Sequence, residues 1–196
     1  MRAPSGQTVT LTIPAAAITG AVNGPVVSMA ADSVLSGISV ANTSTAPARD
    51  GILVQGATGA RIVGNVVTVE TGGAIDVIGA RSVVISGNTI AAGDEAIVLS
   101  DADYATISGN TIAAPGSTGI FMQDSNADVT ISDNVFGEMA YQAIVAGATI
   151  GDPDSFTAAS TSNVLVGPLG SLDRCWEGNL ATTETIAFVD GIDCNF

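Results

Sequence analysis

The chain has 196 residues, 46% of them hydrophobic and only 4% aromatic, which suits a single domain with a narrow core of Ile, Val and Ala. Its 19 acidic residues against five Arg, with no Lys or His, give a net charge of −14 that opposes phosphate backbones and excludes nucleic acid as a partner. No apolar run reaches the length that a membrane span needs.

The first 50 residues predict irregular strands. The segments "TVTLTIP" and "GPVVSMAADSVLSGISV" are rich in β-branched residues but do not follow a strict repeat. The opening residues "MRAPSGQTV" lack the apolar stretch of a signal peptide. We expect a secreted or cell-surface protein whose signal peptide is not part of this chain.

A repeat of 22 to 24 residues begins near residue 50. The segments "RIVGNVV", "VISGNTI", "TISGNTI" and "TISDNVF" align one Asn in a column: Asn65, Asn88, Asn110 and Asn134. A second column keeps step with the first and holds Ile52, Ile75, Ile97, Ile120 and Ile144. A fixed period of this kind indicates a solenoid or a propeller.

The content of one period decides between these architectures. Each period holds two short runs of Ile, Val and Thr bounded by turn residues, which leaves no room for a helix, and it is too short for a propeller blade. The sequence therefore predicts an all-β, single-stranded right-handed parallel β-helix of about six or seven coils. We expect the coils over residues 1–147, and the last strand with a C-terminal cap over residues 148–196.

The alternation of side chains along each strand predicts which residues form the core. The Ile column should point inward, together with the residues two positions later: Val54, Val77, Leu99, Met122 and Ala146. Two further inward columns are Ile62, Ile85, Ile107 and Ile131, then Val67, Ile90, Ile112 and Phe136. The Asn column should form a hydrogen-bonded ladder at an inward bend, which is a structural role.

One outward column is largely apolar. It reads Leu53, Asp76, Val98, Phe121 and Val145. An exposed stripe of this kind usually marks an interface, so it predicts a homo-oligomer or a surface assembly. The alternative is that the N-terminal segment or the tail folds over it.

The tail contains both cysteines, Cys175 and Cys194. An even pair in an extracellular protein predicts a disulfide, which would close the cap over the last coil and stabilise it by about 3 kcal/mol. A cysteine metal site is the weaker alternative because the sequence has no His and no third Cys to complete it.

Columns of "ISGNTI" followed by "GIxI" resemble the right-handed parallel β-helix proteins of the pectate-lyase-like class. The resemblance covers about residues 26 to 147. That class includes polysaccharide lyases, glycoside hydrolases, epimerases, phage tailspikes and noncatalytic surface proteins. The resemblance therefore implies the fold and leaves the function open.

A narrower resemblance concerns Gly93-Asp94-Glu95, which is similar to the Gly-Asp-Asp that carries catalytic carboxylates in polygalacturonase-like glycosidases. It implies Asp94 and Glu95 as catalytic candidates, with Asp76 as an additional outward carboxylate one coil below. The family's other motif positions fall on Gly73 and near Thr118, and its Arg-x-Lys has no counterpart in a chain without Lys.

Acidic residues in these turns also have plainer interpretations. Asp and Glu are ordinary turn residues, and Arg81 should form a surface ion pair with Asp103 of the next coil. No cofactor is expected. Ca²⁺ is the weak alternative, for which neighbouring turns supply additional oxygen donors: Asp101, Asp103, Asp124 and Asp128.

The turns that border the strands are mostly five or six residues long, so nothing evident builds the water-excluding cleft that catalysis favours. We therefore favour a noncatalytic extracellular module with a structural, adhesive or glycan-binding role and a polysaccharide as partner. The alternatives are a polysaccharide hydrolase or lyase acting through outward carboxylates, and a tailspike-like oligomeric receptor-binding module.

Overall fold

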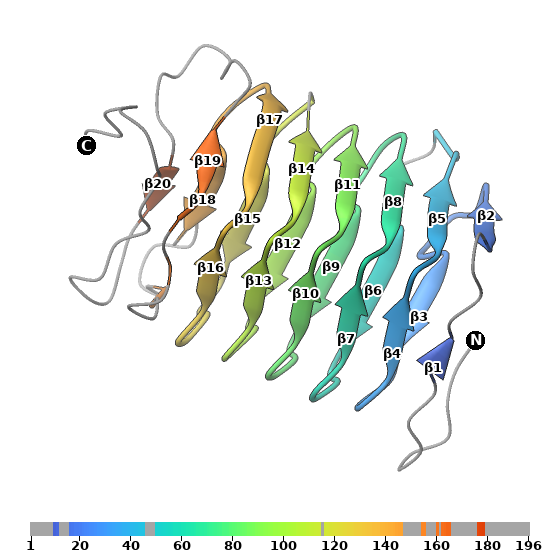
Figure 1. Cartoon of the computed structure of the whole chain (residues 1–196), viewed down its shortest axis with the longest axis horizontal. Helices are drawn as coiled ribbons and strands as arrows, with labels where there is room; N and C mark the ends of the chain where they lie inside the picture. The colour runs from blue at the N-terminus through green and yellow to red at the C-terminus, as the bar shows by residue number, and fades with distance from the viewer. Residues whose placement is uncertain are drawn as a thin grey trace.

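A computed structural model describes residues 10–11, 16–45, 50–114, 116–146, 154–155, 160, 162–165 and 176–178. The described strands stack into one parallel β-helix, and their order along the stack follows the sequence (Figure 1). No helix long and apolar enough to cross a membrane occurs among these residues.

Each coil contributes one strand to each of three parallel sheets. The first sheet contains β1 (Thr10–Leu11), β4 (Val34–Ser36), β7 (Arg61–Val63), β10 (Val84–Ser86), β13 (Thr106–Ser108) and β16 (Thr130–Ser132). The second contains β2 (Ala17–Gly20), β5 (Ser39–Asn42), β8 (Val66–Val69), β11 (Thr89–Ala92), β14 (Thr111–Ala114), β17 (Val135–Met139) and β19 (Val164–Leu165). The third contains β3 (Val27–Met29), β6 (Ile52–Gln55), β9 (Ile75–Ile78), β12 (Ile97–Ser100), β15 (Ile120–Gln123), β18 (Ile144–Ala146) and β20 (Trp176–Gly178).

The strand count corrects the sequence prediction of two strands per coil. The run around each ladder Asn is broken into two strands because the residue before the Asn adopts a left-handed conformation, with φ of +65° at Gly64 and +63° at Gly87 and Gly109. Glycine reaches this conformation without steric cost. The coil therefore has a third side.

The number of coils is also smaller than the predicted six or seven. Five complete three-stranded coils run from β3 to β17 in the described part of the chain, and partial coils flank them. At the N-terminal end β1 and β2 pair onto these coils; at the C-terminal end β18 and β19 do so, and β20 pairs onto β18. The described residues of these five strands form only partial coils. The two predicted cap cysteines, Cys175 and Cys194, lie outside the described residues.

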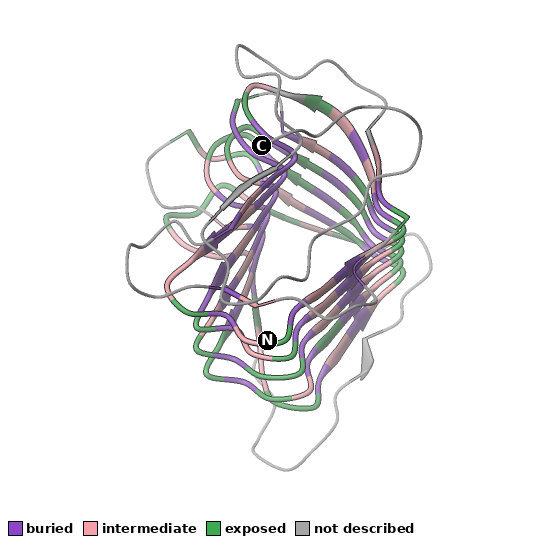
Figure 2. Ribbon diagram, turned by 90° about the vertical axis from the view of Figure 1, so that its left-hand side faces the viewer, coloured by how far each residue is buried: buried purple, intermediate pink, exposed green. Residues whose placement is uncertain are grey.

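The predicted core is confirmed. The Ile column pairs in exact register from coil to coil, as with Ile75 opposite both Ile52 and Ile97. All the residues predicted to point inward are buried, and Figure 2, a view along the stack, shows the three sheets enclosing the buried interior. Burial of each large aliphatic side chain stabilises the fold by about 1.5–3 kcal/mol, and the identical columns repeat this contribution in every coil.

The Asn ladder is confirmed as well. The side-chain amide of Asn88 donates to Oδ1 of Asn110 at 2.9 Å, and the backbone N–H of Asn88 donates to the same oxygen at 2.9 Å. The second amide hydrogen reaches the carbonyl of Ile62 one coil below at 2.9 Å. The same bonds join Asn110 to Asn134. Each buried amide is thus satisfied by its neighbours, as a buried polar group requires.

The ladder extends one rung beyond the predicted column. Asn134 donates to Oδ1 of Asn163 at 3.1 Å, and Asn163 in turn donates to the carbonyl of Ile131 at 2.8 Å. These two Asn residues are 29 residues apart, more than the period of 22 to 24 residues of the other coils. Asn163 therefore does not fall in the column that the repeat predicts. Ser162, with φ of +61°, precedes Asn163, as Asp133, with φ of +56°, precedes Asn134 and as glycines precede the earlier rungs.

Candidate functional site

The outward side of the third sheet brings together most of the sequence-predicted site residues. The register aligns one outward position per coil: Leu53, Asp76, Val98, Phe121 and Val145. All five side chains are partly buried. Asp76, on β9, therefore lies between two apolar neighbours, Leu53 and Val98, on the adjacent strands.

The absence of a side chain at Gly73 makes room for the Asp76 carboxyl group. A Cβ placed on Gly73 would overlap Oδ1 of Asp76. This oxygen is buried and has no hydrogen-bond partner. The carboxyl group of Asp76 is thus folded back against the turn that precedes its own strand, and one of its oxygens is removed from water.

Two further carboxyl groups flank Asp76 on the neighbouring coils. Asp50 and Glu95 each stand two residues before a member of the Ile column, at the position that Gly73 occupies on the coil between them. Successive coils lie about 4.8 Å apart. The carboxyl row, by which we mean Asp50, Asp76 and Glu95, therefore runs along one edge of the third sheet across three coils.

Burial is the largest cause that raises the pKa of Asp76, to about 8. Coulombic repulsion from Asp50, a hydrogen bond to Asp50 and repulsion from Glu95 add to the shift. Burial also raises the pKa of Asp50, whereas its hydrogen bond with Asp76 lowers it. These directions indicate that Asp76 holds a proton near neutral pH and donates it in a hydrogen bond to the Asp50 carboxylate.

The polar edge continues onto the next coil. The hydroxyl of Ser117 donates to Oε1 of Glu95 at 3.1 Å. Ser117 is 9% exposed, so this bond holds the Glu95 carboxylate against the body of the solenoid. Along the stack, this edge of the third sheet therefore presents four polar groups in order: the carboxyl group of Asp50, the protonated carboxyl group of Asp76, the carboxyl group of Glu95 and the hydroxyl of Ser117.

Of the three predicted catalytic candidates, Asp76 and Glu95 lie together in the carboxyl row. Asp94 is exposed in the turn before Glu95. A catalytic role for any of them stays a prediction. Asp50 was missed because it lies at the end of the long segment 41–51, although its position two residues before Ile52, like that of Glu95 before Ile97, could have identified it.

The predicted ion pair is present on another edge of the same sheet. A guanidinium nitrogen of Arg81 lies 3.0 Å from a carboxylate oxygen of Asp103 on the next coil. Arg61, in β7, is exposed on the first sheet.

Among the described residues, no group of three or more His, Cys, Asp or Glu side chains converges closely enough to hold a metal ion. The carboxyl row is spread over three coils. Asp124, one of the predicted Ca²⁺ donors, accepts a hydrogen bond from the Ser100 hydroxyl at 2.6 Å, and Asp103 pairs with Arg81. Calcium binding stays a prediction without a preformed site.

Residues 25–151 match the model of the family described as "Right handed beta helix region". The chain belongs to this family. The match confirms the resemblance to right-handed parallel β-helix proteins and supplies the handedness of the coils.

Among solved structures, the chain is similar to a protein from Parabacteroides merdae ATCC 43184 described as a "putative glycosyl hydrolase". The two share 11% identity, the match covers 82% of this chain and 81% of that one, and the TM-score is 0.57. A likeness at this identity shows the fold alone. No curated protein matches the sequence.

Proposed function

We propose that this β-helix is a noncatalytic module, secreted or at a cell surface, that binds an uncharged polysaccharide along the outward side of the third sheet. The observation that carries the proposal is the carboxyl row beside the apolar stripe, by which we mean Leu53, Val98, Phe121 and Val145. The carbohydrate link of the Parabacteroides merdae protein, as its description reads, supports the choice of ligand class.

The chemistry of a sugar chain suits such a surface. Pyranose rings have apolar faces and hydroxyl edges, so they contact aliphatic side chains and exchange hydrogen bonds with carboxyl groups at the same time. The proton of Asp76 is held in its hydrogen bond to Asp50, and the carboxyl groups of Asp50 and Glu95 supply acceptors for sugar hydroxyl groups. The stripe is partly buried, so its side chains are already ordered and lose little freedom on binding.

The net charge narrows the ligand class. With −14 on the chain, and three carboxyl groups at the proposed surface, an acidic polysaccharide would meet repulsion. An uncharged chain meets none. We therefore infer that neutral glycans bind better than pectate-like or alginate-like ones.

The geometry favours binding over catalysis. The described turn between β11 and β12 spans only residues 93–96, so it adds no wall beside the carboxyl row. Catalytic carboxyl groups work best where water is excluded. An open sheet surface with a short turn beside Glu95 is better suited to holding a glycan than to cleaving it.

One observation favours hydrolysis as a second candidate function. Asp76 carries a proton near neutral pH, as the general acid of a glycosidase must, and Glu95 on the next coil is a candidate base. In that case Asp76→Asn would abolish the release of reducing ends from a glycan, whereas a pure binding module releases none in either form.

Calorimetric titration with uncharged hexasaccharides (cellohexaose, xylohexaose, mannohexaose and chitohexaose) tests binding, with oligogalacturonate as the anionic control. We expect at least one neutral chain to bind, and Val98→Glu to weaken that binding at least tenfold. Thr89→Glu adds the same charge on the exposed side of the second sheet and should change nothing. The proposal fails if no neutral chain binds, or if the two variants behave alike.

A further inference from the structure

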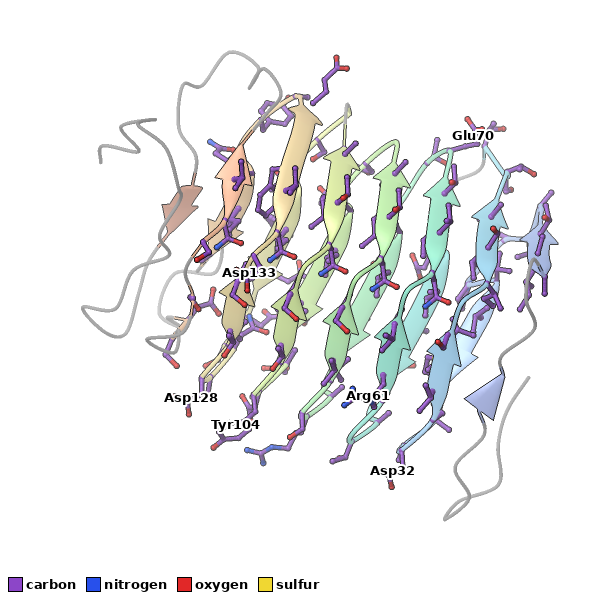
Figure 3. All side chains as sticks on the ribbon, viewed as in Figure 1. Asp32, Arg61, Glu70, Tyr104, Asp128 and Asp133 are labelled. Atoms are coloured by element: carbon purple, nitrogen blue, oxygen red, sulfur yellow. The ribbon has the colours of Figure 1, made fainter. Side chains whose placement is uncertain are left out.

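A column of left-handed turns joins the third sheet to the first. It consists of Asp32, Gly59, Ser82, Tyr104 and Asp128, with φ of +55°, +72°, +54°, +55° and +54°. Figure 3 shows Asp32, Tyr104 and Asp128 along one edge of the solenoid. Gly, Asp and Ser are ordinary residues at turns of this conformation, whereas a bulky aromatic side chain is a steric outlier there. Tyr104 is therefore the exception in its column.

Burial does not explain the exception. Tyr104 is 49% exposed, so its ring gains little from packing against the core. A residue that breaks a local rule without burial in the core to compensate is a candidate for function.

Neighbouring groups hold Tyr104 in place. Its backbone N–H donates to the carbonyl of Ala127 at 2.7 Å, which fixes the turn. The guanidinium carbon of Arg81 lies 5.2 Å from the centre of the Tyr104 ring, a cation–π distance.

Arg81 is itself positioned from the coil above. One guanidinium nitrogen lies 3.0 Å from Oδ2 of Asp103, and Oδ1 of Asp103 accepts the backbone N–H of Ala127 at 3.2 Å. The ring, the guanidinium group and the carboxylate thus form one ordered cluster on two adjacent chain segments, with Arg81 on one and Asp103 and Tyr104 on the other. The side chain of Arg81 is still 57% exposed, so much of its donor capacity faces water.

We propose that Tyr104, Arg81 and Asp103 form a subsite for one pyranose ring that carries no acidic group. The exposed aromatic surface of Tyr104 contacts the apolar face of the sugar ring. The free N–H groups of Arg81 and the Asp103 carboxylate exchange hydrogen bonds with its hydroxyl groups. Because the cluster is preorganised, binding orders few additional side chains.

Charge and size select this ligand class. Two exposed carboxyl groups lie nearby: Asp101 is in the same turn as Tyr104, and Asp128 is in the same column on the next coil. With Asp103 they outnumber the guanidinium group of Arg81 in this cluster and disfavour an acidic sugar. A protein partner of ordinary affinity needs about 800 Å² on each side, whereas this cluster presents one ring and its edge. A single sugar ring matches that area.

The position of the cluster also indicates how a longer glycan would lie on the third sheet. Tyr104 follows the end of β12, whereas Glu95 precedes its start. A glycan that reaches both would follow the strands across the third sheet. This orientation rests on the proposed function, but the single-ring subsite does not.

Chemical-shift perturbation on the full chain tests the subsite, with aromatic signals reporting Tyr104 and methyl signals reporting Val98 and Val145 of the stripe. The probes are methyl β-glucoside and methyl β-glucosaminide, with methyl β-glucuronide as the acidic comparison. We expect the neutral and amino glycosides to shift the Tyr104 ring signals, and the glucuronide to bind more weakly. A glucuronide that binds equally well or better overturns the proposal.

Substitutions test which side chains of the cluster bind the sugar. Tyr104→Phe should retain binding, Tyr104→Ala should weaken it at least tenfold, and Arg81→Gln should weaken it severalfold. Tyr141→Ala is the matched control, because Tyr141 is similarly exposed at 47% and belongs to another turn. Equal losses in the two alanine variants, or none in Tyr104→Ala, overturn the subsite.

The same spectra test the single-ring subsite and glycan binding along the third sheet separately. Shifts at Tyr104 without shifts in the stripe support the subsite and contradict binding along the third sheet. Shifts in the stripe alone overturn the subsite. Shifts at neither place overturn both.

Discussion

Asp76 and Asp50, on adjacent coils, share a hydrogen bond. The pKa of Asp76 is raised from 3.8 to about 8, chiefly by burial and further by its contacts with Asp50. The folded protein therefore binds this proton more tightly than the unfolded chain does. The contribution to stability is present in full below pH 4 and is lost as the pH rises towards 8. The size of the loss scales with the shift, at about 1.4 kcal/mol for each pKa unit.

Urea unfolding at pH 5, 7 and 9 measures this dependence. We expect the wild-type free energy of unfolding to fall by a few kcal/mol across the series, and the fall to be much smaller in Asp76→Asn, which has no proton to lose. Asp94→Asn removes an exposed carboxyl group nearby and should follow the wild type. Parallel curves for wild type and Asp76→Asn would show that Asp76 is not the group responsible.

The fit of Asp76 over Gly73 leads to a second prediction. Gly73→Ala places a methyl group where Oδ1 of Asp76 lies, so one of them must move. We expect a destabilisation of about 1–3 kcal/mol, typical of overpacking. Because φ at Gly73 is not in the left-handed region, the collision with Asp76 is the main cost.

A double-mutant cycle isolates that collision. In an Asp76→Ala background, the added methyl group meets no carboxyl oxygen, so Gly73→Ala should cost less than half as much. Urea unfolding of the four proteins gives the coupling energy. Additive effects would mean that the cost at Gly73 comes from the backbone and not from Asp76.

The core and the ladder could be predicted from the sequence, whereas the environment of Asp76 could not. Ile75 and Asn88 belong to columns that repeat at a nearly fixed period. Equivalent positions in a parallel solenoid stack on one another, so the repeat in the sequence predicts which side chains are in contact. The raised pKa of Asp76 depends instead chiefly on burial, for which the missing side chain at Gly73 makes room, and then on Asp50. Asp50 and Gly73 occupy the same position before the Ile column on neighbouring coils, but the residue type at that position changes from coil to coil, so the repeat does not predict how Asp76 is buried.

The inward bend at the Asn column was predicted, but its division of the run into two strands, which gives the coil a third side, was not. The runs around the ladder residues read as single strands, because Gly87 and Asn88 interrupt the alternation of apolar residues without adding a visible loop. Only the left-handed conformation of Gly87, together with the inward Asn88, turns the chain. The turn is compact because the Asn side chain replaces the hydrogen bonds that a longer loop would provide.

Removal of one rung tests the ladder. Asn110→Ala leaves the backbone and side-chain donors of Asn88 without their acceptor, and it removes the bond to the Ile85 carbonyl. Unsatisfied buried donors are costly, so we expect a loss of about 2–4 kcal/mol in urea unfolding. Thr111→Ala changes the exposed next residue, the first of β14, and should cost less than 1 kcal/mol. Similar losses in the two variants would show that the stacked amides do not stabilise the coil.

The apolar stripe also stays the predicted self-association surface, and light scattering coupled to size exclusion tests this. Phe121 is at the middle of the described stripe, between Val98 and Val145, so a charge there would disrupt any interface that it forms. If copies associate through the stripe, the wild type runs as an oligomer, Phe121→Asp runs as a monomer, and Thr111→Asp on the second sheet leaves the assembly intact. A wild-type protein that is monomeric at high concentration contradicts self-association and leaves this side of the third sheet open to a glycan.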